Sequence, residues 1–206
     1  MSDANPPAID PSLVARVKGI LMQPRPEWDI IDNEYATVRS LFVPYAVLLA
    51  AIGPLAGLLG SVLFGSPSLF GAILGAALGY GFALLIVFVL SLIIDALAPS
   101  FGGVSNRVQA TKVAVYASTA SWVAGVFGIV PVIGGLLALL GALYSAYLLY
   151  LGLNQVMKSP ADKVVLYTIV VIIIMIVISA IAALIVGGVI AGVVGGAVGM
   201  AAITGL

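Results

Sequence analysis

The sequence predicts an all-α integral membrane protein, a bundle of five transmembrane helices preceded by short amphipathic cytoplasmic helices. Of its 206 residues, 63% are hydrophobic and 8% are charged, and the mean hydropathy is +1.27. Soluble domains carry roughly 25% charged residues, so this chain has too few to cover a surface that faces water. Uncharged stretches long enough to cross a bilayer separate three groups of basic residues.

The uncharged stretches place the first two spans at about 41–64 and 70–98. The first span follows Thr37, a plausible N-cap, and contains Pro44 and Pro54. Since a proline frees backbone groups that neighbouring helices or water must satisfy, we expect a kink there. The second span is longer than the roughly 20 residues that a crossing needs, so it should tilt or extend beyond the bilayer.

The third and fourth spans are expected at about 113–130 and 136–153, joined by a tight turn at Pro131 and the glycine pair 134–135. The fifth is expected at 164–190. Because 164–206 carries no charge and would reach about 65 Å as one helix, twice the hydrocarbon thickness, it cannot be one ordinary span.

Two interpretations of the C-terminal stretch follow. The fifth span ends near Ile190 and leaves an apolar, glycine-rich tail at 191–206, or Gly187 and Gly188 form a turn and a sixth span returns. We favour five spans.

The basic residues predict the orientation. They are Arg16, Lys18, Arg25 and Arg39 at the start, Arg107 and Lys112 in the middle, and Lys158 and Lys163 later. With four spans before Lys163, all three groups fall on one side, and the excess of Lys and Arg marks that side as cytoplasmic. The N-terminus is then cytoplasmic. We expect a bacterial inner membrane, or an ER or Golgi membrane if the chain is eukaryotic.

Residues 1–40 predict a cytoplasmic segment of two amphipathic helices, broken near Pro24 and Pro26. Such helices lie on the inner leaflet or dock a partner, and aromatic rings suit the headgroup zone. The candidate residues for membrane-interface contact or partner docking are Arg16, Lys18, Arg25, Trp28 and Tyr35.

Two glycine ladders place small residues on one helix face. They are Gly71, Gly75 and Gly79 in the second span, and Gly188, Gly192 and Gly196 in the tail. Small faces let helix backbones approach closely in a bilayer. The ladders therefore predict packing within the chain or, for the tail, formation of a homo-oligomer.

Asp95 is the only charged residue inside a predicted span. An intramembrane carboxylate is a functional candidate by default, as a cation or proton site. Its place about one turn from the cytoplasmic end also allows a structural role, through pairing with Arg107 or Lys112 across the following loop. The residues of a candidate ion or ligand cavity are Asp95, Arg107, Lys112, Tyr116, Trp122 and Tyr147.

Hydroxyl and aromatic residues recur in the third and fourth spans. They include Tyr116, Ser118, Thr119, Ser121 and Trp122, then Tyr144, Ser145, Tyr147 and Tyr150. Hydroxyl groups at this depth form hydrogen bonds with other helices. They therefore predict either helix–helix packing or a polar pocket for a lipid headgroup or small molecule.

The chain contains no Cys and no His, which removes the thiolate nucleophile and the commonest metal ligand and general base. An intramembrane serine protease would need a basic residue in the bilayer, and an aspartyl protease a second Asp. We therefore expect no enzyme, no catalytic residue, no metal and no cofactor. Zero net charge gives no indication of nucleic-acid binding.

Several short motifs resemble the bacterial branch of the Yip membrane proteins, a family named for interaction with Ypt/Rab GTPases. They are Arg16-Val-Lys-Gly-Ile-Leu21 with Pro26-Glu-Trp28, Phe101-Gly-Gly103, Lys112-Val-Ala-Val-Tyr116 with Trp122, and the segments 143–153 and 158–168. The resemblance spans roughly residues 13–170. It implies five spans and a cytoplasmic N-terminus.

The family's eukaryotic members are linked to vesicle trafficking and GTPase recruitment through a longer N-terminal region with an acidic, Asp-Leu-Tyr-Gly-Pro-like motif. This chain lacks the motif, so the resemblance does not bring a small GTPase partner with it. We expect a non-enzymatic membrane organiser, trafficking-type adaptor or scaffold, in contact with the bilayer and with its own copies or other membrane proteins. The alternative is a transporter or channel for an ion, lipid or small solute.

Overall fold

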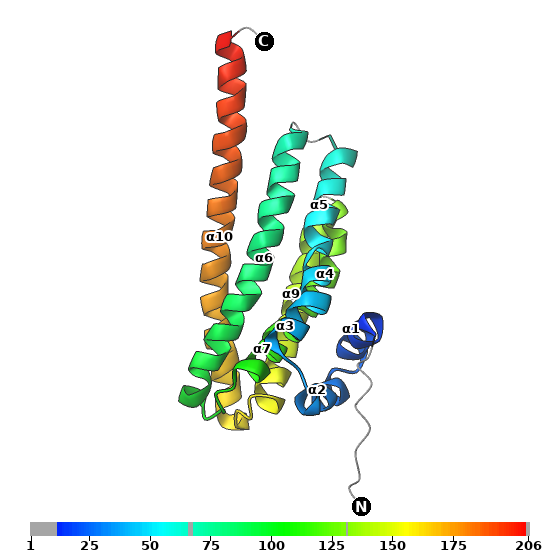
Figure 1. The fold of residues 1–206 in the computed structure, drawn as a ribbon, viewed down its shortest axis with the longest axis vertical. Coiled ribbons are helices and arrows are strands. Elements are labelled where there is room, and N and C mark those ends of the chain that lie inside the picture. Colours follow the sequence, from blue (N-terminus) through cyan, green and yellow to red (C-terminus); the bar gives the residue numbers. More distant parts are fainter. Residues whose placement is uncertain (1–11, 66–67, 131, 205–206) are drawn as a thin grey trace, which may run out of the picture.

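The computed structural model describes residues 12–65, 68–130 and 132–204, and every regular element in these ranges is a helix (Figure 1). In chain order they are α1 (Leu13–Met22), α2 (Pro24–Asn33), α3 (Val38–Leu41), η1 (Phe42–Ala46), α4 (Val47–Ala50), α5 (Ile52–Leu63), α6 (Leu69–Leu97), η2 (Ala98–Phe101), α7 (Arg107–Ala117), α8 (Thr119–Ala124), η3 (Gly125–Ile129), α9 (Ile133–Gln155) and α10 (Ala161–Thr204).

Five stretches of the described chain are long and apolar enough to cross a membrane, which confirms the predicted all-α fold with five spans. They are Val38–Leu63, Leu69–Phe101, Arg107–Ile129, Ile133–Gln155 and Ala161–Gly196. The third stretch is the most buried of the five. It packs against both α6 and α9, so the centre of the bundle is built around α7 and α8.

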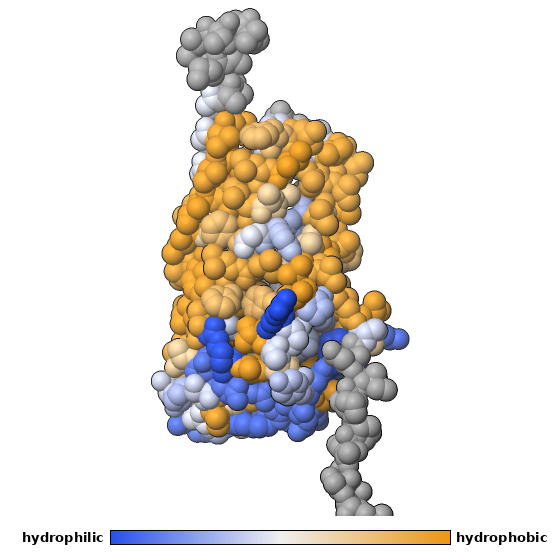
Figure 2. All heavy atoms as spheres, in the orientation of Figure 1, coloured by the Kyte–Doolittle hydropathy of each residue, from blue (hydrophilic) through white to orange (hydrophobic). Residues whose placement is uncertain are grey.

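Hydrophobic atoms cover most of the length of the bundle, whereas hydrophilic atoms gather at one end (Figure 2). This end, called the polar end below, contains α2, η2, the connection 102–106 and the connection 156–160 (Figure 1). The three basic segments of the sequence therefore lie at one end of the bundle. This arrangement agrees with the prediction that all three fall on one side of the membrane.

The third span begins earlier than the sequence predicted, at Arg107 rather than at 113. Asn106 caps this helix, because its side chain accepts hydrogen bonds from two backbone N–H groups, those of Val108 and Gln109. The prediction used the absence of charge to find spans. The predicted span therefore excluded the polar first turns of the helix, which contain Lys112.

Both prolines of the first span coincide with irregular backbone. Pro44 lies in the π-helical turn η1, and the helix is interrupted at Ala51, three residues before Pro54. The third span is also interrupted, at Ser118, and the sequence did not predict this break. A Cβ atom added to Gly125 would lie 2.9 Å from the Cα atom of Gly53, so the two broken spans touch through glycine backbone.

The C-terminal stretch is one helix, α10, which runs through Gly187 and Gly188 to Thr204 without a turn. The described residues therefore contain no returning sixth span. Of the glycine ladder in α6, Gly71 and Gly75 face the side chains of Val194 and Ile190 on α10, so these two glycines pack within the chain.

The remaining ladder positions are open. A Cβ atom added to any of them would have no neighbour within 4 Å in the described structure; they are Gly79, Gly188, Gly192 and Gly196.

The turn predicted at Pro131 lies partly outside the described residues, because Pro131 itself is not among them. The glycine pair 134–135 belongs to the first turn of α9, which begins at Ile133 after Val132 with a φ of 68°. The turn is therefore shorter than predicted, and the fourth span begins earlier.

Candidate functional site

The first two helices form a hairpin, α1 followed by α2, which packs against the bundle at the polar end (Figure 1). The Ser12 side chain caps α1 by accepting a hydrogen bond from the Ala15 N–H, and Pro24 begins α2, where a missing N–H costs nothing. The buried faces of the hairpin include Ile20 and Ile31, each fully covered. The hairpin is therefore part of the folded domain.

Arg16 is buried, with 2% of its surface exposed, although the sequence predicts it as a residue of the membrane interface or of a docking surface. Its guanidinium makes an ion pair with Glu27 at 2.6 Å and a second ion pair with Glu34. It also lies over the ring of Tyr116, 5.4 Å from the centroid. A buried charge requires partners, and this cluster supplies two carboxylates and an aromatic face.

The Arg16 cluster continues into the bundle through aromatic and hydroxyl groups. The rings of Tyr45 and Tyr116 meet edge to face at 4.9 Å, and the Tyr45 hydroxyl is hydrogen-bonded to the Thr119 hydroxyl at 2.9 Å. Thr119 begins α8 directly after the helix interruption at Ser118. The N-terminal hairpin is thus linked to the point where the third span is broken.

Lys112 binds the C-terminal end of α2. Its ammonium is buried, with 3% of the residue exposed, and donates to the carbonyl oxygens of Ile31 at 2.7 Å and Glu34 at 2.6 Å. The last carbonyls of a helix lack partners within the helix, and a cation there also complements the helix dipole. Asp32 is held by Gln109, one turn before Lys112 on α7, and by Lys158 from the 156–160 connection, so α2 is fixed at its end by the third span and that connection.

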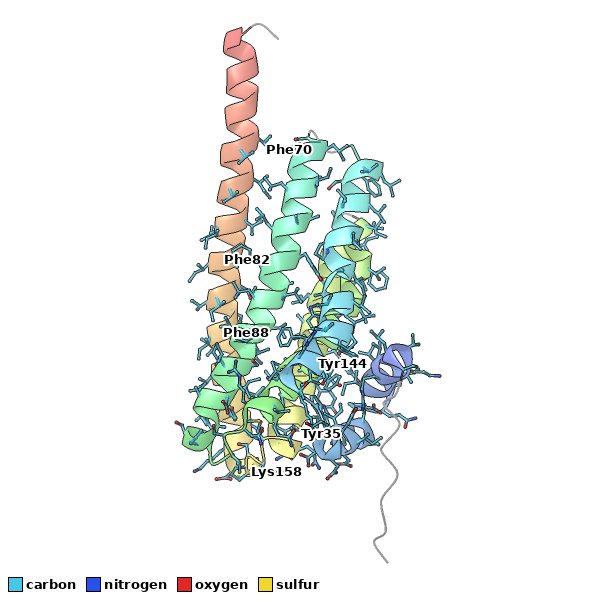
Figure 3. All side chains as sticks on the ribbon, in the orientation of Figure 1. Tyr35, Phe70, Phe82, Phe88, Tyr144 and Lys158 are labelled. Carbon is cyan, nitrogen blue, oxygen red and sulfur yellow. The ribbon has the colours of Figure 1, made fainter. Side chains whose placement is uncertain are left out.

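Trp28 anchors the middle of α2 against α9. The residue is 1% exposed, and a Cβ atom added to Gly152 would lie 2.8 Å from its ring, so a glycine is required at the point of contact. Tyr144, higher on α9, donates its hydroxyl to the carbonyl oxygen of Leu21 at 2.8 Å (Figure 3). Because Tyr144 lies within a span, α1 lies against the side of the bundle.

The other candidate docking residues of the hairpin are on its surface. Lys18 and Arg25 are exposed, and Tyr35, in the connection after α2, is 91% exposed. Two apolar side chains of α1, Val14 and Met22, are also more than two thirds exposed.

The residues of the predicted cavity are distributed over different contacts. Asp95 accepts a hydrogen bond from the Ser105 hydroxyl at 2.8 Å, where pairing with Arg107 or Lys112 was expected. The Arg107 guanidinium instead lies over the ring of Phe88, 5.2 Å from the centroid. Lys112 and Tyr116 belong to the hairpin contacts described above. The structure therefore does not bring these side chains around one cavity.

Trp122 lines a different cavity, of about 550 Å³, between α6, α8, α9 and α10. The walls are mostly apolar, and Ser118, Ser121 and Ser145 contribute hydroxyl groups. The Ser121 hydroxyl is hydrogen-bonded to Ser145 at 2.9 Å, so two of these groups satisfy one another. Tyr147 points elsewhere and contacts the ring of Tyr144. Three of the hydroxyl groups that the sequence identified, those of Ser118, Ser121 and Ser145, thus line a cavity between the helices.

A smaller pocket, of about 350 Å³, lies at the polar end between α2 and the end of α9. Its lining residues are Arg25, Trp28, Asp29, Tyr150, Leu151, Asn154 and Gln155. The lining is mostly polar, in contrast to the cavity inside the bundle. Arg25, Trp28 and Tyr150 are among the residues that the sequence singles out, but no sequence pattern places them together.

The family model of the Yip1 domain matches residues 18–182, which is most of the chain. The chain belongs to the Yip1 domain family. No curated protein and no solved structure matches it. In this Yip1 domain the match includes Trp28, Lys112 and Gly152, and it begins two residues after Arg16. Members of the family are in general non-enzymatic membrane proteins.

The contacts that hold the hairpin on this Yip1 domain were not predicted from the sequence. The sequence predicts Arg16 as an orientation marker and docking residue and Lys112 as an orientation marker and cavity residue, because a basic residue near a span is most simply explained by topology. One signal was available: Glu27 and Glu34 lie seven residues apart, two helical turns, and could face one cation.

Proposed function

We propose that this Yip1-domain protein is a non-enzymatic membrane organiser, a trafficking-type adaptor or scaffold that acts through its polar end. The proposal rests on one observation above all, the attachment of the α1–α2 hairpin to the bundle through the buried Arg16 and Lys112. An adaptor needs a surface of fixed shape. The buried Arg16 and Lys112, each bound to acceptors, hold the hairpin in one orientation on the bundle.

The proposed docking surface consists of the exposed residues of the hairpin and of the connection that follows it. Val14 is 72% exposed, Met22 is 70% exposed, and Tyr35 extends from the 34–37 connection. Exposed apolar side chains beside basic residues such as Lys18 suit contact with both headgroups and a second membrane protein. The partner in this proposal is another membrane protein or a second copy of the chain.

In this proposal the polar end faces the cytoplasm, and the membrane is a bacterial inner membrane or, in a eukaryotic cell, the ER or Golgi. The exposed basic residues Lys18, Arg39 and Lys158 at this end support that orientation, because cytoplasmic segments carry the excess of positive charge.

Proximity labelling from the N-terminus tests the adaptor proposal. The wild type is compared with a Met22→Ser, Tyr35→Ala double variant, which removes exposed side chains without touching the core, and with Phe64→Ser, which truncates an exposed side chain at the opposite end. We expect a set of neighbours that the double variant loses and Phe64→Ser keeps. Identical neighbours in all three proteins, with no change in membrane morphology on deletion, would contradict the proposal.

Transport of an ion, lipid or small solute is the second candidate, and the 550 Å³ cavity between α6, α8, α9 and α10 favours it. Reconstituted liposomes test it with Ala146→Phe, which fills the cavity, and with Ala138→Phe, which adds the same ring to an exposed position of α9. Transport requires flux or lipid scrambling that Ala146→Phe abolishes and Ala138→Phe retains. A role of Asp95 as cation or proton site predicts loss of pH dependence in Asp95→Asn. If the liposomes show no flux for any substrate of a broad panel, this candidate is excluded.

A further inference from the structure

The polar pocket between α2 and α9 contains two opposite charges that do not pair. Arg25 and Asp29 are four residues apart on α2, which puts them on the same face of the helix. Such a pair commonly forms an ion pair, yet within the described part of the chain neither side chain makes one. A cationic and an anionic group thus both border the pocket, each available to a ligand.

A third polar group at the pocket is buried and unsatisfied. Trp28 forms part of the wall, and its indole Nε1 is buried without a hydrogen-bond acceptor among the described residues. Burying an N–H donor without an acceptor costs about 1–3 kcal/mol, so such groups are uncommon unless a ligand or water supplies the missing partner.

The pocket lies where a bilayer has its headgroups. The α1 helix lies against the side of the bundle, where Tyr144 of α9 donates to the Leu21 carbonyl oxygen (Figure 1). Its apolar side chains Val14 and Met22 are exposed. The α2 helix lies next to it on the polar side, and the pocket is formed by α2 and the last turns of α9. Its polar lining matches this level, since headgroups flank the hydrocarbon core on each side.

We propose that this pocket binds a phosphate ester of a primary amine, the phosphoethanolamine group. The Arg25 guanidinium faces the phosphate, and the Asp29 carboxylate accepts hydrogen bonds from the ammonium. A volume of about 350 Å³ is at the small end of ligand pockets, which suits a headgroup.

The chemistry distinguishes this group from choline and glycerol headgroups. A choline ammonium carries no N–H and cannot donate to Asp29, and a glycerol headgroup offers no cation. We therefore expect phosphatidylethanolamine to bind in preference to phosphatidylcholine and phosphatidylglycerol. The inference adds a ligand to the surface that the proposed function uses, and it holds even if no protein docks there, because lipid binding needs no partner.

Native mass spectrometry of the full-length protein in mild detergent tests the proposal, with the three phospholipids carrying identical acyl chains. Arg25→Gln and Asp29→Asn should each weaken phosphatidylethanolamine binding about tenfold, the equivalent of one charge-assisted hydrogen bond. Both residues are exposed, so the fold should survive either change. Arg39→Gln and Asp162→Asn, two exposed positions outside the pocket, are the matched controls and should bind as the wild type does.

A second arm distinguishes an intact lipid from a soluble headgroup. Glycerophosphoethanolamine carries the same two charges without acyl chains. If it binds and the two pocket variants weaken it, the headgroup suffices; if only the lipid binds with that dependence on Arg25 and Asp29, the chains contribute as well. Both results support the site. Equal binding of the ethanolamine and choline lipids, or wild-type binding by both pocket variants, would overturn it.

Discussion

Arg16 carries a charge at a position that is 2% exposed, beside two carboxylates that are themselves largely covered. Removing such a group from water costs free energy. Its interactions with the two carboxylates offset that cost only if every partner is in place. Removing the cation alone leaves two buried negative charges facing each other. The net contribution of the cluster to stability can therefore be small, whereas the loss on breaking it is large.

We predict that Arg16→Met destabilises the protein by about 3 kcal/mol, because Glu27 and Glu34 lose their common partner. Arg39→Met, at an exposed site, should change stability by less than about 0.5 kcal/mol. Denaturant unfolding in mild detergent measures both. Adding Glu27→Gln and Glu34→Gln to Arg16→Met should restore part of the loss, since the uncompensated charges are then gone. Equal stability of the two single variants would show that the cluster is dispensable.

The helices and the contacts between them differ in how far the sequence predicts them. Hydropathy located the spans because each is a local, uncharged stretch as long as the bilayer is thick. The interruption at Ser118 and the burial of Arg16 involve contacts between distant segments. Tyr45 and Thr119, for example, are 74 residues apart. Those contacts leave no periodic signal in the sequence, so the site at the polar end could not be assembled from it.

Attachment of α2 to α9 depends on a glycine at one contact. We predict that Gly152→Ala destabilises the protein by about 1–3 kcal/mol, because its Cβ atom would lie 2.8 Å from the buried Trp28 ring. Gly79→Ala, within α6 and without a neighbour in 4 Å, should be neutral or stabilising by up to about 1 kcal/mol. Thermal unfolding in detergent, followed by tryptophan fluorescence, compares them. If Gly152→Ala is as stable as the wild type, Trp28 of α2 does not pack against α9 at this glycine.

Self-association of α10 through its glycine ladder stays a prediction. Gly188 and Gly192 have open space around them in the described structure, which suits a second helix, but lipid fills such space equally well. If the ladder forms the contact, Gly192→Leu should lower the yield of crosslinked dimer in native membranes several-fold, whereas Gly79→Leu on α6 should not. A monomer for the wild type, both in mild detergent and in crosslinked membranes, would exclude this contact.

At the scale of the whole molecule, the charged groups with assigned contacts concentrate at one end. Arg16, Lys112 and Asp95 all make their contacts near the polar end, and Figure 2 shows the remainder of that face as largely hydrophobic. The charge pattern of the sequence already indicated such a division. It gave no indication that two of the basic residues are buried and hold a helical hairpin in place.

Orientation can be measured directly because the chain has no cysteine of its own. Ser100→Cys is exposed at the polar end, and Phe64→Cys is exposed at the opposite end. With the polar end in the cytoplasm, a membrane-impermeant maleimide should label Phe64→Cys in intact cells or spheroplasts, and Ser100→Cys only after permeabilisation. With five spans and an unbroken α10, a cysteine added after the C-terminus should react like Phe64→Cys. The reverse pattern would invert the topology, and a C-terminal cysteine that reacts like Ser100→Cys would require an even number of crossings.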